Sequence, residues 1–172
     1  MRIITVFTAI LLSLWLTGCG IAQSASERAV DLSNSIFTWD VRALHLDIMA
    51  RSELNMDDDG HSSPVVIRIY QLKKADAFNS VSYQELVDQD SDILKESLLE
   101  SKEIVLKPNT AISIDAPFHK QAKAVGIAAL YKEPNIKENN WRIVLKRGDL
   151  NITKPREIIA SQYTIRLVEE NK

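Results

Sequence analysis

From residue 44 onward, apolar and polar side chains alternate along much of the chain, and this pattern predicts β-strands with one buried face. Other segments are short apolar runs rich in β-branched and aromatic residues, which also favour strands. Turn residues separate these segments, as many short strands joined by turns are typical of a sandwich or barrel. Strands are predicted at 44–50, 65–70, 104–106, 112–114, 123–131, 141–145 and 163–167, with a short eighth strand at 149–153.

Two features modify this all-β pattern. The segment Ser82-Tyr83-Gln84-Glu85 has the form of a capping box that starts a helix. Leu86, Leu94 and Leu98 follow at helical spacing, and the Asp-Ser-Asp run at 90–92 is expected to interrupt the helix and cap a second one. We therefore predict a helical insertion over about 82–99, packed on the sandwich. Gly126 lies inside a predicted strand, where glycine indicates a bulge or a close approach.

The first residues have the pattern of a secretory signal peptide: Arg2, an apolar run over 3–16, and then small residues. A single-pass anchor or an ordinary cleaved signal are the alternatives, although the apolar run is shorter than the roughly 20 residues of a membrane span. The segment ends in Leu16, Thr17, Gly18 and Cys19, which resembles the lipobox of bacterial lipoproteins. That resemblance implies cleavage before Cys19, diacylglycerol on its sulfur and a further acyl chain on its new amine. Gly20 stands where an Asp would favour the inner membrane, which points to the outer membrane.

Composition adds limits to this organisation. The hydrophobic content of 45% and charged content of 26% are those of a folded domain, and the net charge of −2 gives no indication of nucleic-acid binding. Small and polar residues after Cys19 predict a tether, although 25–32 could equally form a short helix. We divide the chain into a signal peptide (1–18), a lipidated tether (19–37) and one β-sandwich domain (38–172).

The densest polar cluster begins at Asn55, and its spacing of Asn55, Asp57, Asp59 and Gly60 resembles the start of an EF-hand calcium loop. The twelfth position, which should be a bidentate acid, is Val66 inside a predicted strand. Helices on either side are not predicted either. The alternative interpretation is a solvated acidic turn, in which Asp and Gly provide the turn geometry.

No catalytic motif emerges from the sequence. The three histidines are His45 on the outward face of a strand and His61 and His119 in loops, without the spacing of a zinc site. Cys19 has no second cysteine to pair with, and no nucleophile elbow or nucleotide-binding loop is present. We predict a protein that is not an enzyme and has no cofactor or metal. Trp39 and Trp141 are interpreted as packing residues, and the Lys-Arg pair at 146–147 as solvating a strand end.

Taken in order, these parts resemble the outer-membrane lipoprotein of the type VI secretion system, the TssJ (SciN/VasD) family. The resemblance covers nearly all of the chain after Cys19. It is carried by Leu-Asn-Met-Asp at 54–57 with Gly60, the strand at 64–73, Phe78, Tyr83, Leu86, Leu94, Lys-Pro at 107–108, the strand at 125–131, and Trp-Arg at 141–142. Met56 stands where the family often has Pro, and the stretch before Trp39 is longer than is usual.

The resemblance implies a transthyretin-like sandwich of two sheets on the periplasmic face of the outer membrane. It implies recruitment of the C-terminal periplasmic part of TssM, and through it an indirect link to TssL, with no small-molecule substrate. The alternative function is a periplasmic ligand- or calcium-binding lipoprotein unrelated to secretion. The family's partner-contact loop corresponds to 52–63, where the site residues are expected to be Asn55, Asp57, Asp58, Asp59, Gly60 and His61, all but the glycine as exposed side chains.

Overall fold

The computed structural model describes residues 41–169 of the chain. The predicted signal peptide, the lipobox residues Leu16, Thr17 and Gly18, the lipidation site Cys19 and the packing role of Trp39 lie outside the described residues. In the described part of the chain, no helix has the length and apolar content needed to span a membrane.

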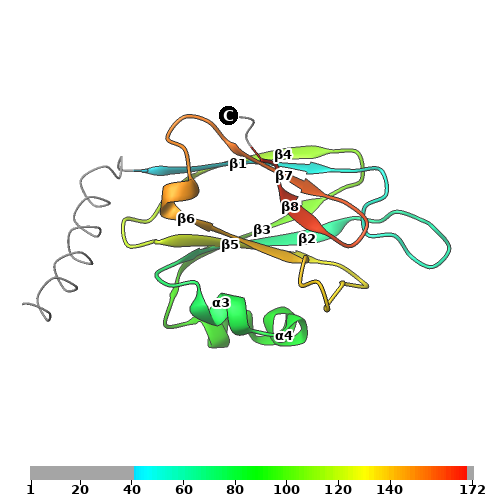
Figure 1. The fold of residues 1–172 in the computed structure, drawn as a ribbon, viewed down its shortest axis with the longest axis horizontal. Coiled ribbons are helices and arrows are strands. Elements are labelled where there is room, and N and C mark those ends of the chain that lie inside the picture. Colours follow the sequence, from blue (N-terminus) through cyan, green and yellow to red (C-terminus); the bar gives the residue numbers. More distant parts are fainter. Residues whose placement is uncertain (1–40, 170–172) are drawn as a thin grey trace, which may run out of the picture. The chain divides into compact units, whose positions relative to one another are not determined.

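Within residues 41–169, eight strands form two four-stranded sheets stacked face to face (Figure 1). The first sheet has the order β4-β1-β7-β8, in which β1 and β7 run parallel and the other neighbours antiparallel. The second has the order β3-β2-β5-β6 and is antiparallel throughout. The predicted two-sheet β-sandwich is therefore confirmed. Its strands are β1 (Ala43–Ala50), β2 (Val65–Leu72), β3 (Leu98–Leu106), β4 (Ala111–Pro117), β5 (Ala124–Leu130), β6 (Arg142–Lys146), β7 (Arg156–Ala160) and β8 (Ile165–Leu167).

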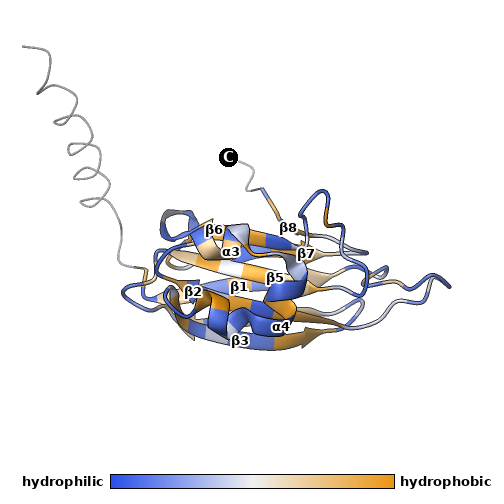
Figure 2. Cartoon of the chain, turned by 90° about the horizontal axis from the view of Figure 1, so that it is seen from below, coloured by the Kyte–Doolittle hydropathy of each residue, from blue (hydrophilic) through white to orange (hydrophobic). Residues whose placement is uncertain are grey.

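Burial explains why the strands differ in their sequence patterns. In β1, Leu44, Leu46 and Ile48 are buried between the sheets, and the residues between them are more exposed, so this strand alternates. The strands β2 and β5 lie in the middle of the second sheet and are buried on both faces for most of their length. Strands covered on both faces need apolar residues at nearly every position. Figure 2 shows this contrast between apolar strands and hydrophilic connecting loops.

Two helices cover the outer face of the second sheet (Figure 1). They are α3 (Asp76–Ser80) and α4 (Tyr83–Leu94). The capping box is confirmed, since Ser82 accepts from the backbone of Glu85 and the Glu85 carboxylate accepts from the backbone of Ser82. The predicted start at 82 is the N-cap of α4, but the prediction misses the separate helix α3. The predicted end at 99 is wrong, because Leu98 and Leu99 begin β3, where Leu98 pairs with Leu72 of β2.

The helix α4 is kinked at Gln89, where φ is −139° and ψ is 29°, one residue before the predicted interruption at 90–92. Arg68 of β2 explains the kink, because its guanidinium donates to the carbonyl oxygens of Leu86 and Val87, both at 3.2 Å. A side chain that captures helix carbonyls competes with the backbone ladder and bends the helix. Asp90 then accepts from the hydroxyl of Tyr70 at 2.8 Å, which fixes the second half of α4 to the sheet.

Gly126 of β5 is a point of close approach, as predicted. A Cβ atom at this position would lie 3.0 Å from ring atoms of Phe78, which is fully buried in α3. The end of α3 is held from the neighbouring strand, where the Arg142 guanidinium donates to the carbonyl oxygen of Val81 at 2.8 Å and lies over the ring of Trp141. Trp141 is buried, so its predicted packing role is confirmed.

The predicted eighth strand at 149–153 is wrong. Arg147–Asp149 form a short 3₁₀ helix, η1, and the segment after it is a loop. The strand lies further on, at Arg156–Ala160, where it pairs with β1. Its apolar residues Ile158, Ile159 and Ala160 stand in succession after Arg156 and Glu157, so no alternating pattern marks the strand.

The connections between strands gather at two opposite ends of the sandwich. One end, called the loop end here, carries the connections 51–64, 107–110, 131–141 and 161–164. The other, called the entry end, carries the first described residues and the connections 118–123 and 147–155. The Phe118 amide donates to the carbonyl oxygen of Arg42 at 2.8 Å, which fixes the start of the chain at the entry end. Figure 1 shows the connection 51–64 at the end opposite to the start of β1.

Candidate functional site

The connection between β1 and β2, residues 51–64, contains the acidic cluster and is the candidate site. Its two arms are joined by hydrogen bonds. The Ser62 hydroxyl donates to the carbonyl oxygen of Ser52 at 2.6 Å, and the Ser63 amide donates to the carbonyl oxygen of Leu54 at 3.0 Å. Leu54 is fully buried and anchors the first arm in the core. The loop is therefore a closed, two-armed projection.

Asn55 holds the base of this projection, and its predicted exposure is wrong. Only 3% of its surface is exposed, and its backbone has a φ of +47°, a left-handed conformation that asparagine tolerates better than most residues. Its side-chain amide donates to the carbonyl oxygen of Pro64 at 2.9 Å and to the Ser63 hydroxyl at 3.2 Å. Its side-chain oxygen accepts from the amide of Lys132 at 2.9 Å. Asn55 thus ties both arms to each other and to the β5–β6 connection.

Two further connections support the same base. The Asn55 amide donates to the carbonyl oxygen of Gln162, and the Arg51 amide to that of Ala160, both at 2.9 Å. The hydroxyl of Tyr131 donates to the carbonyl oxygen of Thr164 at 2.6 Å, which links the β5–β6 and β7–β8 connections. Burial raises the pKa of the Tyr131 phenol, so it remains a neutral donor at physiological pH. The loop therefore stands on a hydrogen-bonded base made by three connections.

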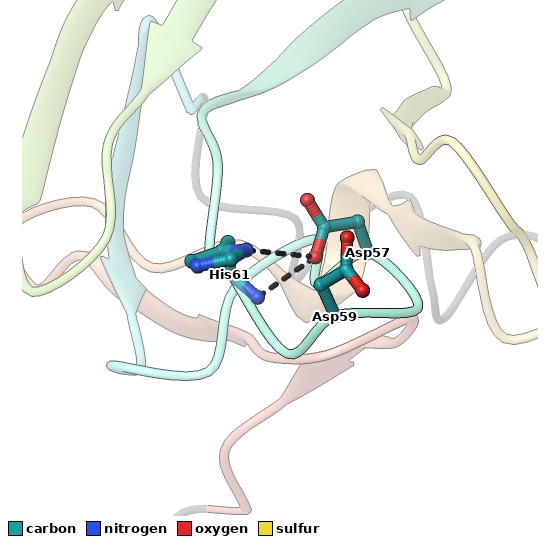
Figure 3. Close-up of side chains that lie close together, drawn as sticks. All are labelled: Asp57, Asp59 and His61. Carbon is teal, nitrogen blue, oxygen red and sulfur yellow. Dashed lines mark hydrogen bonds and ion pairs between the residues drawn. The ribbon is translucent and has the colours of Figure 1, made fainter.

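The tip of the loop is a tight turn over residues 57–61 (Figure 3). The Gly60 amide donates to the carbonyl oxygen of Asp57 at 2.9 Å, and the Asp57 amide to that of His61 at 3.1 Å. Gly60 has a φ of +81°, which favours glycine. The His61 amide also donates to the carboxylate of Asp57 at 2.8 Å, so a side-chain hydrogen bond closes the turn in addition to the backbone bonds.

The tip is strongly acidic, with Asp57, Asp58 and Asp59 in succession. Asp58 and Asp59 are exposed, and Asp57 is half-buried. The hydrogen bond from the His61 amide is the main reason why the pKa of Asp57 lies below its usual range, and the His61 ring, 3.6 Å away, adds a smaller contribution. Asp57 is therefore ionised at neutral pH, and the tip presents a negative surface to solvent.

Asp57, Asp59 and His61 also place three potential ligand atoms within 4.8 Å of one another. Calcium takes six to eight oxygen ligands, and an imidazole nitrogen is not among those it prefers. The EF-hand interpretation needs the Asn55 side chain as its first ligand, yet that side chain is turned inward and bonded to Pro64 and Lys132. The arrangement therefore fits a solvated acidic turn better than a calcium loop.

The histidines provide no nucleophile–base pair in the described part of the chain. His45 of β1 is bonded to Asp115 of β4, its direct cross-strand neighbour, on the outer face of the first sheet. The ring of His119 accepts from the amide of Gln121. Across residues 41–169 no histidine is hydrogen-bonded to a serine hydroxyl, the contact by which a histidine base activates a serine nucleophile.

The structure brings together the six residues predicted from the sequence in one loop, but it gives them different surroundings. Asp57, Asp58, Asp59, Gly60 and His61 form the tip, whereas Asn55 belongs to the buried base. Lys132 and Gln162 are not predicted from the sequence, and they meet Asn55 only through their backbones. A backbone contact leaves no signal in residue type, so no sequence pattern could have identified them.

The role of Asn55 leads to a prediction about stability. Replacing Asn55→Gly keeps a residue that tolerates positive φ but removes the side-chain bonds to Pro64, Ser63 and Lys132. Two of these partners are backbone groups that would lose their bonds in a half-buried position. We expect the free energy of unfolding to fall by about 1–3 kcal/mol, measured by urea denaturation.

The matched control is Asn109→Gly, because Asn109 also has a positive φ, +58°, but is exposed. The control changes backbone freedom in the same way and should alter stability by less than about 0.5 kcal/mol. Equal losses in the two variants would show that the buried amide of Asn55 adds nothing beyond its backbone conformation.

Comparison with known proteins extends the interpretation of this site. Residues 42–169 match the family described as "Type VI secretion lipoprotein, VasD, EvfM, TssJ". A chain in a structure described as "Type VI membrane complex" is 40% identical, with a TM-score of 0.72, and the match covers 75% of this chain and 99% of that one.

Two further solved structures are similar. A chain in "T6SS protein TssM C-terminal domain (869-1107) from EAEC" is 37% identical with a TM-score of 0.70, over 76% of this chain and 100% of that one. The lipoprotein TssJ1 from Pseudomonas aeruginosa is 25% identical with a TM-score of 0.65, over 76% and 98%. Comparison with curated proteins gave no match. The family match covers well over half of the chain, and so this protein is a member of the type VI secretion lipoprotein family that includes TssJ.

Proposed function

We propose that this lipoprotein is anchored by acylated Cys19 to the periplasmic face of the outer membrane and holds the C-terminal periplasmic part of TssM through the loop 52–63. The observation that carries the proposal is the family match combined with a rigid acidic projection at the loop end. TssL would be linked to it only indirectly, through TssM. The proposal requires no catalysis, no cofactor and no small-molecule substrate.

The positions of the two ends support this division of roles. The described chain begins at the entry end, and so any anchor near the N-terminus pulls on that end of the sandwich. The loop 52–63 lies at the opposite end, where an anchored domain would present it away from its point of attachment. A partner that reaches across the periplasm would meet the acidic tip first.

The comparisons support TssM as the partner. In the structure described as the TssM C-terminal domain, the match covers the whole of the matched chain and 76% of the present chain. That share of 172 residues is about 131 residues. The TssM segment named in that description runs from 869 to 1107 and is far longer than the matched chain. This difference supports the interpretation that the matched chain is a separate polypeptide that accompanies the TssM segment.

The chemistry of the loop supports a role in recognition. Rigid strands hold it, and the bonds of Asn55, Ser62 and Ser63 keep its arms together, so little ordering is needed when a partner binds. Three consecutive carboxylates favour a partner surface that is basic or rich in hydrogen-bond donors. Such surface charges increase the rate of encounter more than they increase affinity.

This proposal predicts the effect of removing the charges while keeping the hydrogen-bond acceptors. In Asp57→Asn/Asp58→Asn/Asp59→Asn, the Asn side chain at 57 can still accept from the His61 amide. We expect association with the TssM C-terminal periplasmic part to slow by about tenfold, measured by surface plasmon resonance at low salt, with a smaller change in dissociation.

A matched control removes three charges from the other end of the molecule, in Asp76→Asn/Asp92→Asn/Glu96→Gln. These three residues are exposed around the helices α3 and α4 and should leave association unchanged. A loss of the same size in both variants would indicate a general effect of net charge, and unchanged association in the loop variant would reject the acidic tip as the contact.

The anchor rests on Leu16, Thr17, Gly18 and Cys19, and it leads to its own test. Cys19→Ser removes the sulfur that accepts diacylglycerol, because a hydroxyl is a far weaker nucleophile than a thiolate. Without acyl chains no hydrophobic anchor remains, and a protein whose net charge is −2 is not held on an anionic membrane by charge alone. We expect the variant to leave the outer-membrane fraction, whereas a Ser24→Ala control in the tether should remain there. A Cys19→Ser protein that still co-fractionated with the outer membrane would contradict the anchor.

A further inference from the structure

A net charge close to zero conceals a cluster of lysines at the entry end. Five exposed lysines lie there. Two follow β2, two lie in the connection between β4 and β5, and one is the last residue of β6, directly before η1. Across residues 41–169, none of the five takes part in an ion pair. The lysine cluster consists of Lys73, Lys74, Lys120, Lys123 and Lys146.

Strand register places these lysines next to one another. Leu72 of β2 pairs with Ala124 of β5, and Ala124 pairs with Lys146 of β6. Lys73 comes directly after Leu72, and Lys123 comes directly before Ala124. The two lysines therefore lie side by side where β2 ends and β5 begins. The Lys123 amide donates to the carbonyl oxygen of Leu72 at 2.8 Å, which fixes this arrangement. Neighbouring like charges repel one another, and an anion that bridged them would relieve that cost.

The connections that carry the cluster are held in place from below. Gln71 is buried, accepts from the His119 amide at 2.7 Å and donates to the carbonyl oxygen of Pro117 at 2.8 Å. The Arg147 guanidinium donates to the carbonyl oxygens of Ala122 at 2.7 Å and Val41 at 2.8 Å. The prediction that Arg147 simply solvates a strand end is therefore wrong. Arg147 joins the lysine-bearing connection 118–123 to Val41, the first described residue.

The charge is most one-sided around the β4–β5 connection. Lys73 and Lys74 border a hollow that is also lined by Asp76, Asp92 and Glu96, and these carboxylates offset part of their charge. Near Lys146, the Asp149 carboxylate is bonded to the Lys146 backbone amide at 2.8 Å. Lys120 and Lys123 have no carboxylate beside them in the connection 118–123, which reads Phe-His-Lys-Gln-Ala-Lys.

We propose that the lysine cluster binds the anionic phospholipid headgroups of the membrane in which the protein is anchored. This inference rests on the proposed anchor at Cys19. Attraction between lysines and such a surface extends over about 8–10 Å, the screening length at physiological salt. The 21 residues between Cys19 and Val41 can extend to at most about 70 Å, so the tether by itself leaves the distance and orientation of the domain open. Headgroup contact would hold the entry end down and direct the loop 52–63 into the periplasm.

The test uses the full mature lipoprotein, reconstituted through its acyl chains into vesicles of phosphatidylcholine alone or of phosphatidylcholine with phosphatidylglycerol. The vesicles are isolated by flotation and treated with an amine-acetylating reagent, and the rate at each lysine is measured by mass spectrometry. We expect Lys120, Lys123 and Lys146 to react several-fold more slowly in the phosphatidylglycerol vesicles. Lys73 and Lys74 should be protected to a smaller extent, because carboxylates offset part of their charge. High salt should remove the difference, because it screens the attraction.

Lysines away from the entry end provide the internal control. Lys102, Lys107 and Lys137 are exposed on β3 and at the loop end, and they should react equally in both kinds of vesicle. The variant Lys120→Glu/Lys123→Glu/Lys146→Glu should lose the protection that remains at Lys73 and Lys74. The matched variant Lys102→Glu/Lys107→Glu/Lys137→Glu, with the same change in charge, should keep it.

The outcomes separate this inference from the proposed anchor. If the protein floats with both kinds of vesicle but its entry-end lysines react equally in each, the lysine cluster does not bind headgroups, and the anchor stands. Equal protection of lysines at both ends would also overturn the inference, because contact would then not be confined to the entry end. Failure to float with either kind of vesicle would overturn the anchor and this inference together.

Discussion

The arrangement at the loop end depends on one buried amide side chain. Asn55 has three hydrogen-bonding positions in use, and they reach the second arm of its own loop and the β5–β6 connection. An unpaired polar group in this position would cost free energy, so the partners of Asn55 are held in one arrangement. The acidic tip carries charge but rests on this base. Rigidity and charge are therefore supplied by different residues of one short segment, and the tip residues can change without disturbing the support.

Elements with a clear local pattern in the sequence could be predicted, and elements placed by tertiary contacts could not. In β1, Leu44, Leu46 and Ile48 alternate with more exposed residues, and the sequence pattern alone was sufficient. In β7, Ile158, Ile159 and Ala160 stand in succession after two charged residues, so no alternating pattern marks this strand. The helix α4 was found through its capping box, whereas the five-residue α3 has no side-chain cap and was missed. Its place is determined by tertiary contacts of Phe78 and Arg142, which the sequence does not reveal.

The candidate site was also predictable only where the sequence alone carries the signal. Its acidic residues were visible as a cluster, but the sequence could not distinguish a ligand-bearing Asn55 from a buried one, because the same residue type suits both roles. The contacts of the side chain decide between them, and one of these is with the amide of Lys132, 77 residues away. Arg147 was misjudged for a similar reason. Its partners are backbone carbonyl oxygens, which any residue type can provide.

The two ends of the sandwich carry clusters of opposite charge. The tip at the loop end is acidic, and the lysine cluster lies at the entry end, where the described chain begins. The proposed function would use this difference, with the lysines toward the membrane and the acidic tip toward TssM. The summed charge of −2 gives no indication of it, because the contributions largely cancel.

The central claim, that TssM is held by a pre-ordered loop at the end opposite to the anchor, can be tested most directly by hydrogen exchange. The amides of the chain would be compared with and without the C-terminal periplasmic part of TssM. The account predicts slower exchange in 52–63 and around Lys132, and unchanged exchange in 118–123 and 146–149. Protection confined to the entry end, with the loop 52–63 exchanging at its free rate, would contradict it.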